Sequence, residues 1–137
     1  MSALKKSDLA GVRPTSWTDE QLASFTHHLI KVSKPMVIVA NKIDIPESEE
    51  NYEKIVDAGY RAVPCCAEAE LALRRAAERK LINYIPGDSD FELLKPEELT
   101  SQQKKALELI RERVLSKYGS TGVVEAINTA VFELLQM

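Results

Sequence analysis

Three polar side chains follow directly after an apolar run near the middle of the first half of the chain. They are Asn41, Lys42 and Asp44, and the run before them spans residues 36–40 and is rich in β-branched side chains. Such a run predicts a strand that is buried on both faces of a parallel sheet. In sheets of this kind ligands bind outside the carboxyl ends of the strands, so we expect these side chains to emerge where a ligand would lie.

The chemistry of the three side chains fits a purine base, and guanine in particular. The Asp44 carboxylate can accept two parallel hydrogen bonds from the N1–H and the exocyclic amine of guanine, a donor pair that adenine lacks. The Asn41 amide can reach N7 of the base while it braces neighbouring loops, and the Lys42 stem can lie along the base plane. Because Asn, Lys and Asp are also common turn residues, a polar loop without a ligand is the alternative interpretation.

A second strand is expected to bring another loop beside the first. Residues 49–58 predict a helix, Gly59 a left-handed cap, and residues 60–64 a strand that leads into Cys66 and Ala67. Strand, helix and strand within about 30 residues predict a right-handed βαβ unit, in which the two strand ends lie side by side.

These two loops resemble the fourth and fifth sequence motifs of GTPases. Asn41-Lys42-Ile43-Asp44 resembles the base-reading motif Asn-Lys-x-Asp, and Cys66-Ala67-Glu68 resembles the fifth motif, usually written Ser-Ala-x. The resemblance implies that the backbone N–H of Ala67 contacts guanine O6. Cys66 departs from the motif, because a thiol is a poorer hydrogen-bond partner than the usual hydroxyl.

Longer strings resemble the archaeal branch of the YchF-type, Obg-related, translation-associated GTPases. They lie at residues 34–44, 67–77, 84–87 and 118–123. This resemblance implies GTP or GDP as the nucleotide, Mg²⁺ in the full-length parent, the ribosome as a partner and a cytoplasmic location. A related branch that prefers ATP carries Glu at the end of the base motif, so Asp44 implies guanine.

The resemblance also leads us to expect a fragment. None of the five glycines belongs to a Gly-x-x-x-x-Gly-Lys-Ser/Thr phosphate loop, and no Asp-x-x-Gly follows a strand. Family members also continue into a small β-rich TGS domain. We expect residues 1–15 to be a remnant of an inserted helical region or a linker. Residues 16–137 would form an α/β fold, the guanine-binding half of a P-loop GTPase-type G domain with a helical extension, and would not hydrolyse GTP alone.

Helices are expected to dominate the rest of the chain. Capping boxes begin at Thr18, with Trp17 as a hydrophobic staple, and at Thr100. The stripes expected to be buried after them are Leu22, Phe25, Leu29 and Val32, and Ala106, Leu107, Ile110, Val114 and Leu115.

The segment between these stripes is expected to supply further core contacts. A helix over residues 67–80 should turn Leu71 and Leu73 inward, and a loop over residues 81–98 should be anchored by Ile85, Phe91 and Leu93. Glu68 and Glu70 are explained by the dipole of the helix that they begin.

Composition narrows the classes of protein further. The 137 residues are 45% hydrophobic and carry a formal net charge of -3, which indicates no polycationic surface for nucleic acid. No apolar run reaches the roughly 18 residues of a membrane span. Adjacent Cys65 and Cys66 are expected to be reduced thiols, and His27 and His28 have no cysteine pair at metal-ligand spacing.

Two functions from different classes therefore remain open. In the first, the chain is the base-recognition part of a ribosome-linked GTPase and contacts the nucleotide through Asn41, Lys42, Asp44, Cys66 and Ala67. The alternative is a helical protein-interaction module with vestigial nucleotide binding. In either case two buried strands without neighbours would leave apolar edges, which predicts self-association.

Overall fold

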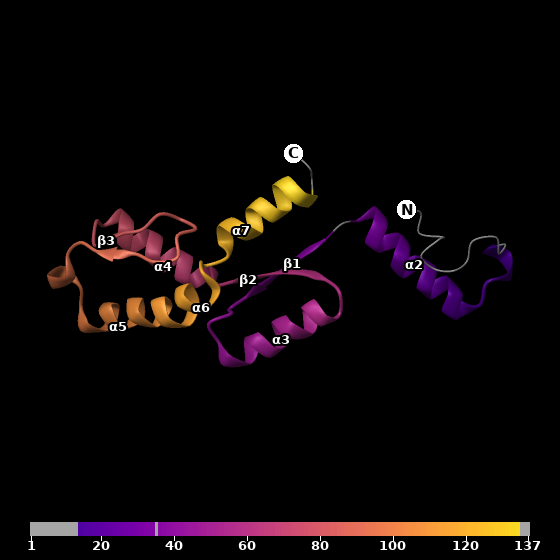
Figure 1. Ribbon diagram of the computed structural model, residues 1–137, viewed down its shortest axis with the longest axis horizontal. Coiled ribbons are helices and arrows are strands. Elements are labelled where there is room, and N and C mark those ends of the chain that lie inside the picture. Colours follow the sequence, from indigo (N-terminus) through magenta and orange to yellow (C-terminus); the bar gives the residue numbers. More distant parts are fainter. Residues whose placement is uncertain (1–13, 35, 135–137) are drawn as a thin grey trace. The chain divides into compact units, whose positions relative to one another are not determined.

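The computed structural model describes residues 14–34 and 36–134 (Figure 1). The chain divides into two compact units, residues 1–36 and residues 37–137. The boundary predicted before Ser16 lies beside residues outside the described part and stays a prediction. Among the described residues, no helix is both long and apolar enough to cross a membrane.

The first unit contains the short 3-10 turn η1 (Pro14–Ser16) and helix α2 (Asp19–Ser33). The predicted capping box is confirmed, because Thr18 accepts from the Gln21 backbone and Gln21 accepts from the Thr18 backbone. Trp17 packs against Phe25, with 4.8 Å between ring centroids.

The apolar stripe predicted to be buried along α2 is not buried. Leu22 is 52% exposed and Leu29 is 44% exposed, while the side chain of Val32 lies outside the described residues. In the described part of this unit, η1 is the only element that accompanies α2, so most of the stripe has nothing to pack against.

The second unit begins with the predicted strand, helix and strand. Strands β1 (Val37–Asn41) and β2 (Arg61–Cys65) are parallel, and helix α3 (Pro46–Asp57) connects them. The helix begins three residues earlier than predicted because Pro46, with its fixed φ and missing N–H, suits a first helical turn. Gly59 adopts the predicted left-handed conformation, with φ at +77°.

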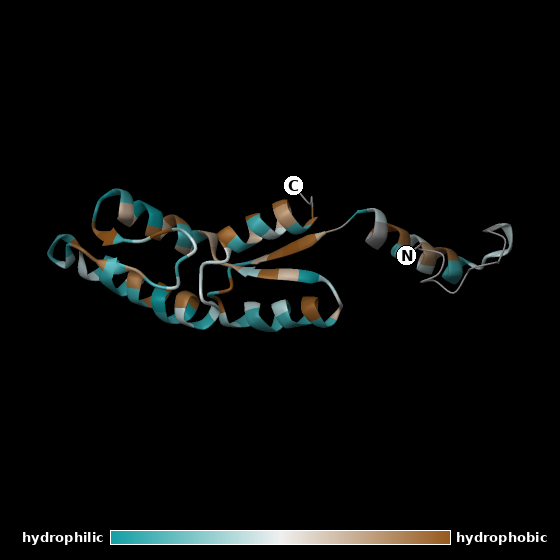
Figure 2. Cartoon of the chain, turned by 45° about the horizontal axis from the view of Figure 1, so that its top comes forward, coloured by the Kyte–Doolittle hydropathy of each residue, from teal (hydrophilic) through white to brown (hydrophobic). Residues whose placement is uncertain are grey.

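The prediction that the first strand is buried on both faces is wrong. Val63 and Cys65 of β2 are buried, but Val39 of β1 is 44% exposed. Figures 1 and 2 show α3 on one side of the strand pair and α7 on the other, and Figure 2 shows β1 as largely hydrophobic. Among the described residues β1 pairs with β2 alone, so its second edge lacks a neighbouring strand that would shield its side chains.

The remaining elements form a mainly helical extension. They are α4 (Ala67–Glu78), β3 (Ile82–Asn83), β4 (Glu92–Leu93), η2 (Pro96–Glu98), α5 (Ser101–Ile110), the π-helical η3 (Arg111–Leu115), α6 (Ser116–Tyr118), α7 (Val123–Asn128) and the π-helical η4 (Thr129–Leu134). Strands β3 and β4 pair antiparallel. The mixed α/β architecture with one short parallel strand pair confirms the predicted fold class, a partial G domain with a helical extension.

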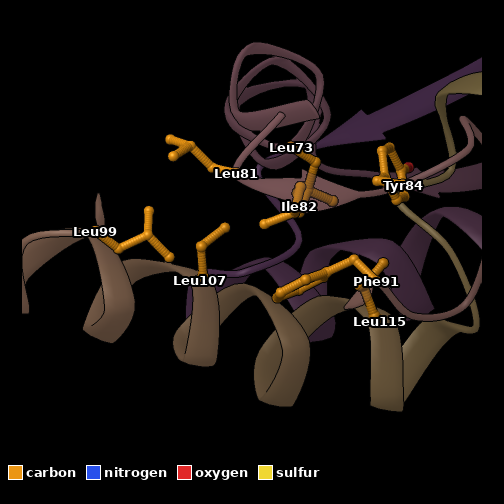
Figure 3. Packing of buried hydrophobic residues seen from close by; sticks show 8 residues of the cluster. All are labelled: Leu73, Leu81, Ile82, Tyr84, Phe91, Leu99, Leu107 and Leu115. Atoms are coloured by element: carbon orange, nitrogen blue, oxygen red, sulfur yellow. The ribbon is translucent and has the colours of Figure 1, made fainter. Parts of the chain in front are cut away.

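The main hydrophobic core lies in this extension, between α4, the β3–β4 hairpin and the run from α5 to η3 (Figure 3). Its buried members are Leu73, Leu81, Ile82, Tyr84, Phe91, Leu99, Leu107 and Leu115. The capping box predicted at Thr100 begins α5, and Gly119, at φ +78°, ends the helical run.

Four predicted core contacts in this unit are wrong, and one of them is Ala106 of α5, which is exposed beside the buried Leu107. Leu73 is fully buried but Leu71 is 48% exposed, because residues two apart on a helix point about 200° apart. Ile85 and Leu93 are also exposed, whereas Phe91 is buried as predicted. Ile82 and Tyr84 supply the anchors in this segment. Alternate residues of an extended chain share a side, so Ile85 points away from the side that Tyr84 occupies.

Candidate functional site

The two predicted loops leave the same edge of the strand pair. In the parallel register Asn41 at the end of β1 lies opposite Cys65 at the end of β2. The backbone N–H of Ile43 donates to the carbonyl of Cys65 over 3.2 Å, which joins the two loops directly. The structure therefore brings the five residues predicted from the sequence into two adjoining loops.

Asn41 connects the first loop to the start of α4. Its Oδ1 accepts one hydrogen bond from the backbone N–H of Lys42, over 2.9 Å, and another from that of Ala67, over 3.1 Å. Lys42 has a positive φ of 64°, which turns the chain sharply after the strand. These contacts confirm that Asn41 braces neighbouring loops.

The backbone N–H of Ala67 is engaged by Asn41 in this structure. The expected contact with guanine O6 would need that N–H to be shared with the base or released by Asn41. The role of Ala67 toward the base therefore stays a prediction.

Asp44 is held by the residue that departs from the usual motif. The Cys66 thiol donates to Asp44 Oδ1 over 3.2 Å, and Cys66 is only 3% exposed. Burial, together with the neighbouring Asp44 carboxylate, raises the pKa of the Cys66 thiol to about 11 against the opposing effect of the Ala69 backbone N–H. The thiol thus keeps its proton at neutral pH, as a donor to a carboxylate must.

A small cluster of buried side chains packs against these loops. Ile43, the variable residue of the base motif, packs with Cys66, Ala69 and Val114. Val114 belongs to η3, so the π-helical turn supports both loops. Cys65 and Cys66 are both free and buried.

A cavity of about 350 Å³ opens beside Asp44 and Cys66, a volume within the range of about 300 to 1,000 Å³ typical of ligand pockets. One wall comes from the loops and α4, and the other from α5 and η3, where Arg113 is the cationic member. Asp44 and Cys66 line this cavity, whereas Asn41, Lys42 and Ala67 lie outside its lining.

Comparison of the sequence with known proteins assigns the chain to a family. Residues 39–137 match the family described as Obg-like GTPase YGR210-like, G4 motif-containing domain. The chain belongs to this family. The predicted relation to Obg-type GTPases is thereby confirmed, while the finer assignment to the YchF-type branch stays a prediction.

Two curated relatives of this G4 motif-containing domain are both named uncharacterized GTP-binding proteins. One, from Methanocaldococcus jannaschii, is 41% identical over 126 residues, which are 90% of this chain and 31% of the relative. The other, from Schizosaccharomyces pombe, is 30% identical over 131 residues, which are 88% of this chain and 31% of the relative. The chain thus spans about a third of the length of the relatives it matches. No solved structure matches it significantly.

Within this G4 domain, sequence reasoning missed the residues that the helical extension contributes. Arg113 and Ile110 line the cavity from η3 and α5, more than 60 residues beyond Asp44 in the chain. Glu70 was explained by the helix dipole, but it is buried and accepts hydrogen bonds from Tyr84 and Thr121. The sequence carries no periodic signal for such contacts, because their partners come from separate elements.

The described residues offer no ready metal site. Within that part of the chain, no three His, Cys, Asp or Glu side chains are grouped so that they could hold a metal ion.

Proposed function

We propose that this chain recognises the guanine base of GTP or GDP with the loops that follow β1 and β2. The observation that supports the proposal best is the joining of the two loops, in which the Cys66 thiol donates to the Asp44 carboxylate over 3.2 Å and Asn41 accepts from the backbone N–H of Ala67. Asp44 accepts from N1–H and the exocyclic amine of guanine, Asn41 reaches N7, and Lys42 lies along the base plane.

The proposal extends to the larger protein by resemblance. The relatives are named GTP-binding proteins, and the resemblance to YchF-type translation factors suggests a ribosome-linked GTPase in which Mg²⁺ accompanies the phosphates. These 137 residues contain no glycine-rich phosphate loop, so in this proposal they choose the base, and other residues hold the phosphates.

The deciding experiment exchanges the base preference. In Asp44→Asn the side-chain amide NH2 can donate to O2 of xanthine, the oxygen that stands where guanine has its exocyclic amine. We therefore expect xanthosine to replace guanosine as the preferred nucleoside. Titrations of guanosine, xanthosine and adenosine followed by NMR should show guanosine affinity falling about tenfold or more, because the charge is removed and the NH2 group of Asn faces the exocyclic amine of guanine, donor against donor.

Two further variants complete this experiment. Asp44→Ala should abolish the preference for guanosine over adenosine. Asp88→Asn makes the same chemical change as Asp44→Asn at an exposed residue away from the loops and should behave as wild type. An unchanged guanosine preference in Asp44→Ala would defeat the assignment of Asp44.

A second candidate is the helical interaction module. It is favoured by exposed apolar side chains on the C-terminal helices, where Ile127 is 57% exposed and Phe132 is 62% exposed. If it holds instead, guanosine and adenosine will shift the same resonances to the same small extent.

A further inference from the structure

The corner between α6 and α7, residues 119–122, contacts the loop after β2 through its backbone. The carbonyl oxygen of Thr121 accepts a hydrogen bond from the backbone N–H of Cys66 over 2.9 Å. Thr121 is fully buried, with 0% of its surface exposed. Cys66 is therefore held at its backbone by this corner, and its thiol in turn donates to Asp44.

Gly122 brings the corner unusually close to β2. A Cβ atom at this position would lie 1.9 Å from the carbonyl oxygen of Pro64, and the φ of Gly122 is +78°. Both the approach and the conformation exclude a larger side chain without displacement of the backbone. The end of β2 and the corner are thus packed backbone to backbone just before Cys66.

A buried carboxylate anchors the corner to α4. Glu70 is 4% exposed, and its Oε2 accepts from Thr121 Oγ1 over 2.5 Å and from the Tyr84 hydroxyl over 2.7 Å. Its Oε1 accepts from Arg74 Nε over 2.6 Å. Cys66 is the N-cap of α4, and Glu70 lies in the first turn of the same helix. The corner therefore bonds to two nearby points of one segment, the Cys66 backbone and the Glu70 side chain.

We infer that the corner over residues 119–122, anchored by Glu70, is a positioning element for base recognition. This inference rests on the proposed function. Thr121 holds Cys66 at the place where its thiol meets the Asp44 carboxylate, and Gly122 allows the approach. Thr121, Gly122 and Glu70 are positioning residues, because each acts on the base through Cys66 and Asp44.

The test compares substitutions that keep or remove the Thr121 hydroxyl. Thr121→Val keeps the shape but removes the bond to Glu70, and Thr121→Ser keeps the hydroxyl. Thr129→Val is the matched control, since Thr129 is also a buried threonine of the C-terminal segment but belongs to η4, beyond the corner. The readout is the rate of amide hydrogen exchange at Cys66 divided by the rate at Leu107 in α5. This ratio corrects for any loss of stability of the whole chain.

In Thr121→Val we expect the Cys66 amide to exchange at least about fivefold faster relative to Leu107, as the loss of one hydrogen bond implies. In Thr121→Ser and Thr129→Val the relative exchange rate at Cys66 should stay within about twofold of wild type, which is smaller than the change expected in Thr121→Val. Equal exchange in Thr121→Val and Thr121→Ser would overturn the inference. If Thr121→Val does not fold, Tyr84→Phe weakens the same Glu70 anchor and is expected to speed exchange at Cys66 in the same way.

Nucleoside titrations of the same variants separate this inference from the proposed function. Guanosine affinity should fall about fivefold in Thr121→Val and stay unchanged in Thr129→Val. Faster exchange at Cys66 with unchanged guanosine affinity would overturn the positioning role. A wild-type chain without any guanosine preference would defeat the proposed function, while exchange at Cys66 would still decide whether the corner holds the loop.

Discussion

Strand β1 and the core of the helical extension differ sharply in how well their apolar side chains are buried. Val39 of β1 is 44% exposed, whereas Leu73 and Leu115 of the extension are 0% and 1% exposed. The first base loop follows this weakly covered strand, yet its Ile43 packs against Val114 of the extension. Cys66 of the second loop is held by Thr121. The strands carry these loops, and the extension holds them in position.

The largest expected effect comes from comparing an apolar side chain of β1 with one from the core of the extension. Leu73→Ala removes a fully buried side chain and should lower the free energy of unfolding by about 2 to 5 kcal/mol. Val39→Ala removes a side chain that is already half in water and should cost less than about 1 kcal/mol. Urea unfolding of both variants measures the two values. Similar losses would mean that the strand pair contributes as much to stability as the extension.

The next effect concerns Glu70, whose contacts connect the two regions. Burial opposes its ionisation, but the hydrogen bonds from Thr121, Tyr84 and Arg74 outweigh burial and hold the pKa of Glu70 below its ordinary value of 4.5. Its contribution to stability is therefore fully present above pH 4.5 and is lost as the pH falls through the lowered pKa.

Glu70→Gln removes this charge and should cost about 2 kcal/mol at neutral pH, because a neutral amide replaces a carboxylate that accepts three bonds. Thermal unfolding from about pH 7 to pH 3 should show a shallower acid loss in Glu70→Gln than in wild type. Glu68→Gln, an exposed neighbour on the same helix turn, should retain the wild-type slope. An equal slope in Glu70→Gln would show that Glu70 does not titrate as described.

A smaller effect is expected at Cys66. Cys66→Ala removes the donor to Asp44 and should cost about 1 kcal/mol in stability and weaken guanosine binding severalfold. Cys66→Ser restores a donor with a stronger hydroxyl and should bind guanosine at least as well as wild type. Calorimetric titration distinguishes them, and weaker binding by Cys66→Ser than by Cys66→Ala would argue against the hydrogen bond as the important contact.

The smallest effect on stability is expected on the exposed side of β1. Val39→Lys should change the free energy of unfolding by less than about 0.5 kcal/mol, as is usual for surface positions. It should reduce the predicted self-association, since a charged residue blunts an apolar strand edge. Sedimentation at several concentrations measures this, and a monomeric wild type would rule out self-association through β1.

Much of the site could be predicted from local sequence. The apolar run before Asn41, the left-handed glycine at 59 and the second strand were enough to place two loops at one sheet edge. Parallel strands that are joined by one helix leave their carboxyl ends together, so no knowledge of distant residues was needed.

The wrong predictions concern burial, which depends on the elements that pack against a helix or strand. The run at β1 was apolar enough to predict burial on both faces, but burial also needs neighbours, and β1 pairs with β2 alone among the described residues. Residue type alone predicts Leu71 and Ile85 in the core, but helix geometry turns Leu71 away from the side of Leu73, and the extended chain after β3 turns Ile85 away from the side of Tyr84.

The sequence by itself determined the chemical identity of the candidate base contacts, because Asn41, Lys42 and Asp44 carry their donors and acceptors wherever they lie. The tertiary structure alone decided what holds them. Thr121 reaches Cys66, and Arg113 reaches the cavity, only after α4 and α5 have packed around their common core. Local sequence patterns report neighbours within a few residues, whereas these contacts join segments that are separated by dozens of residues and meet only on folding.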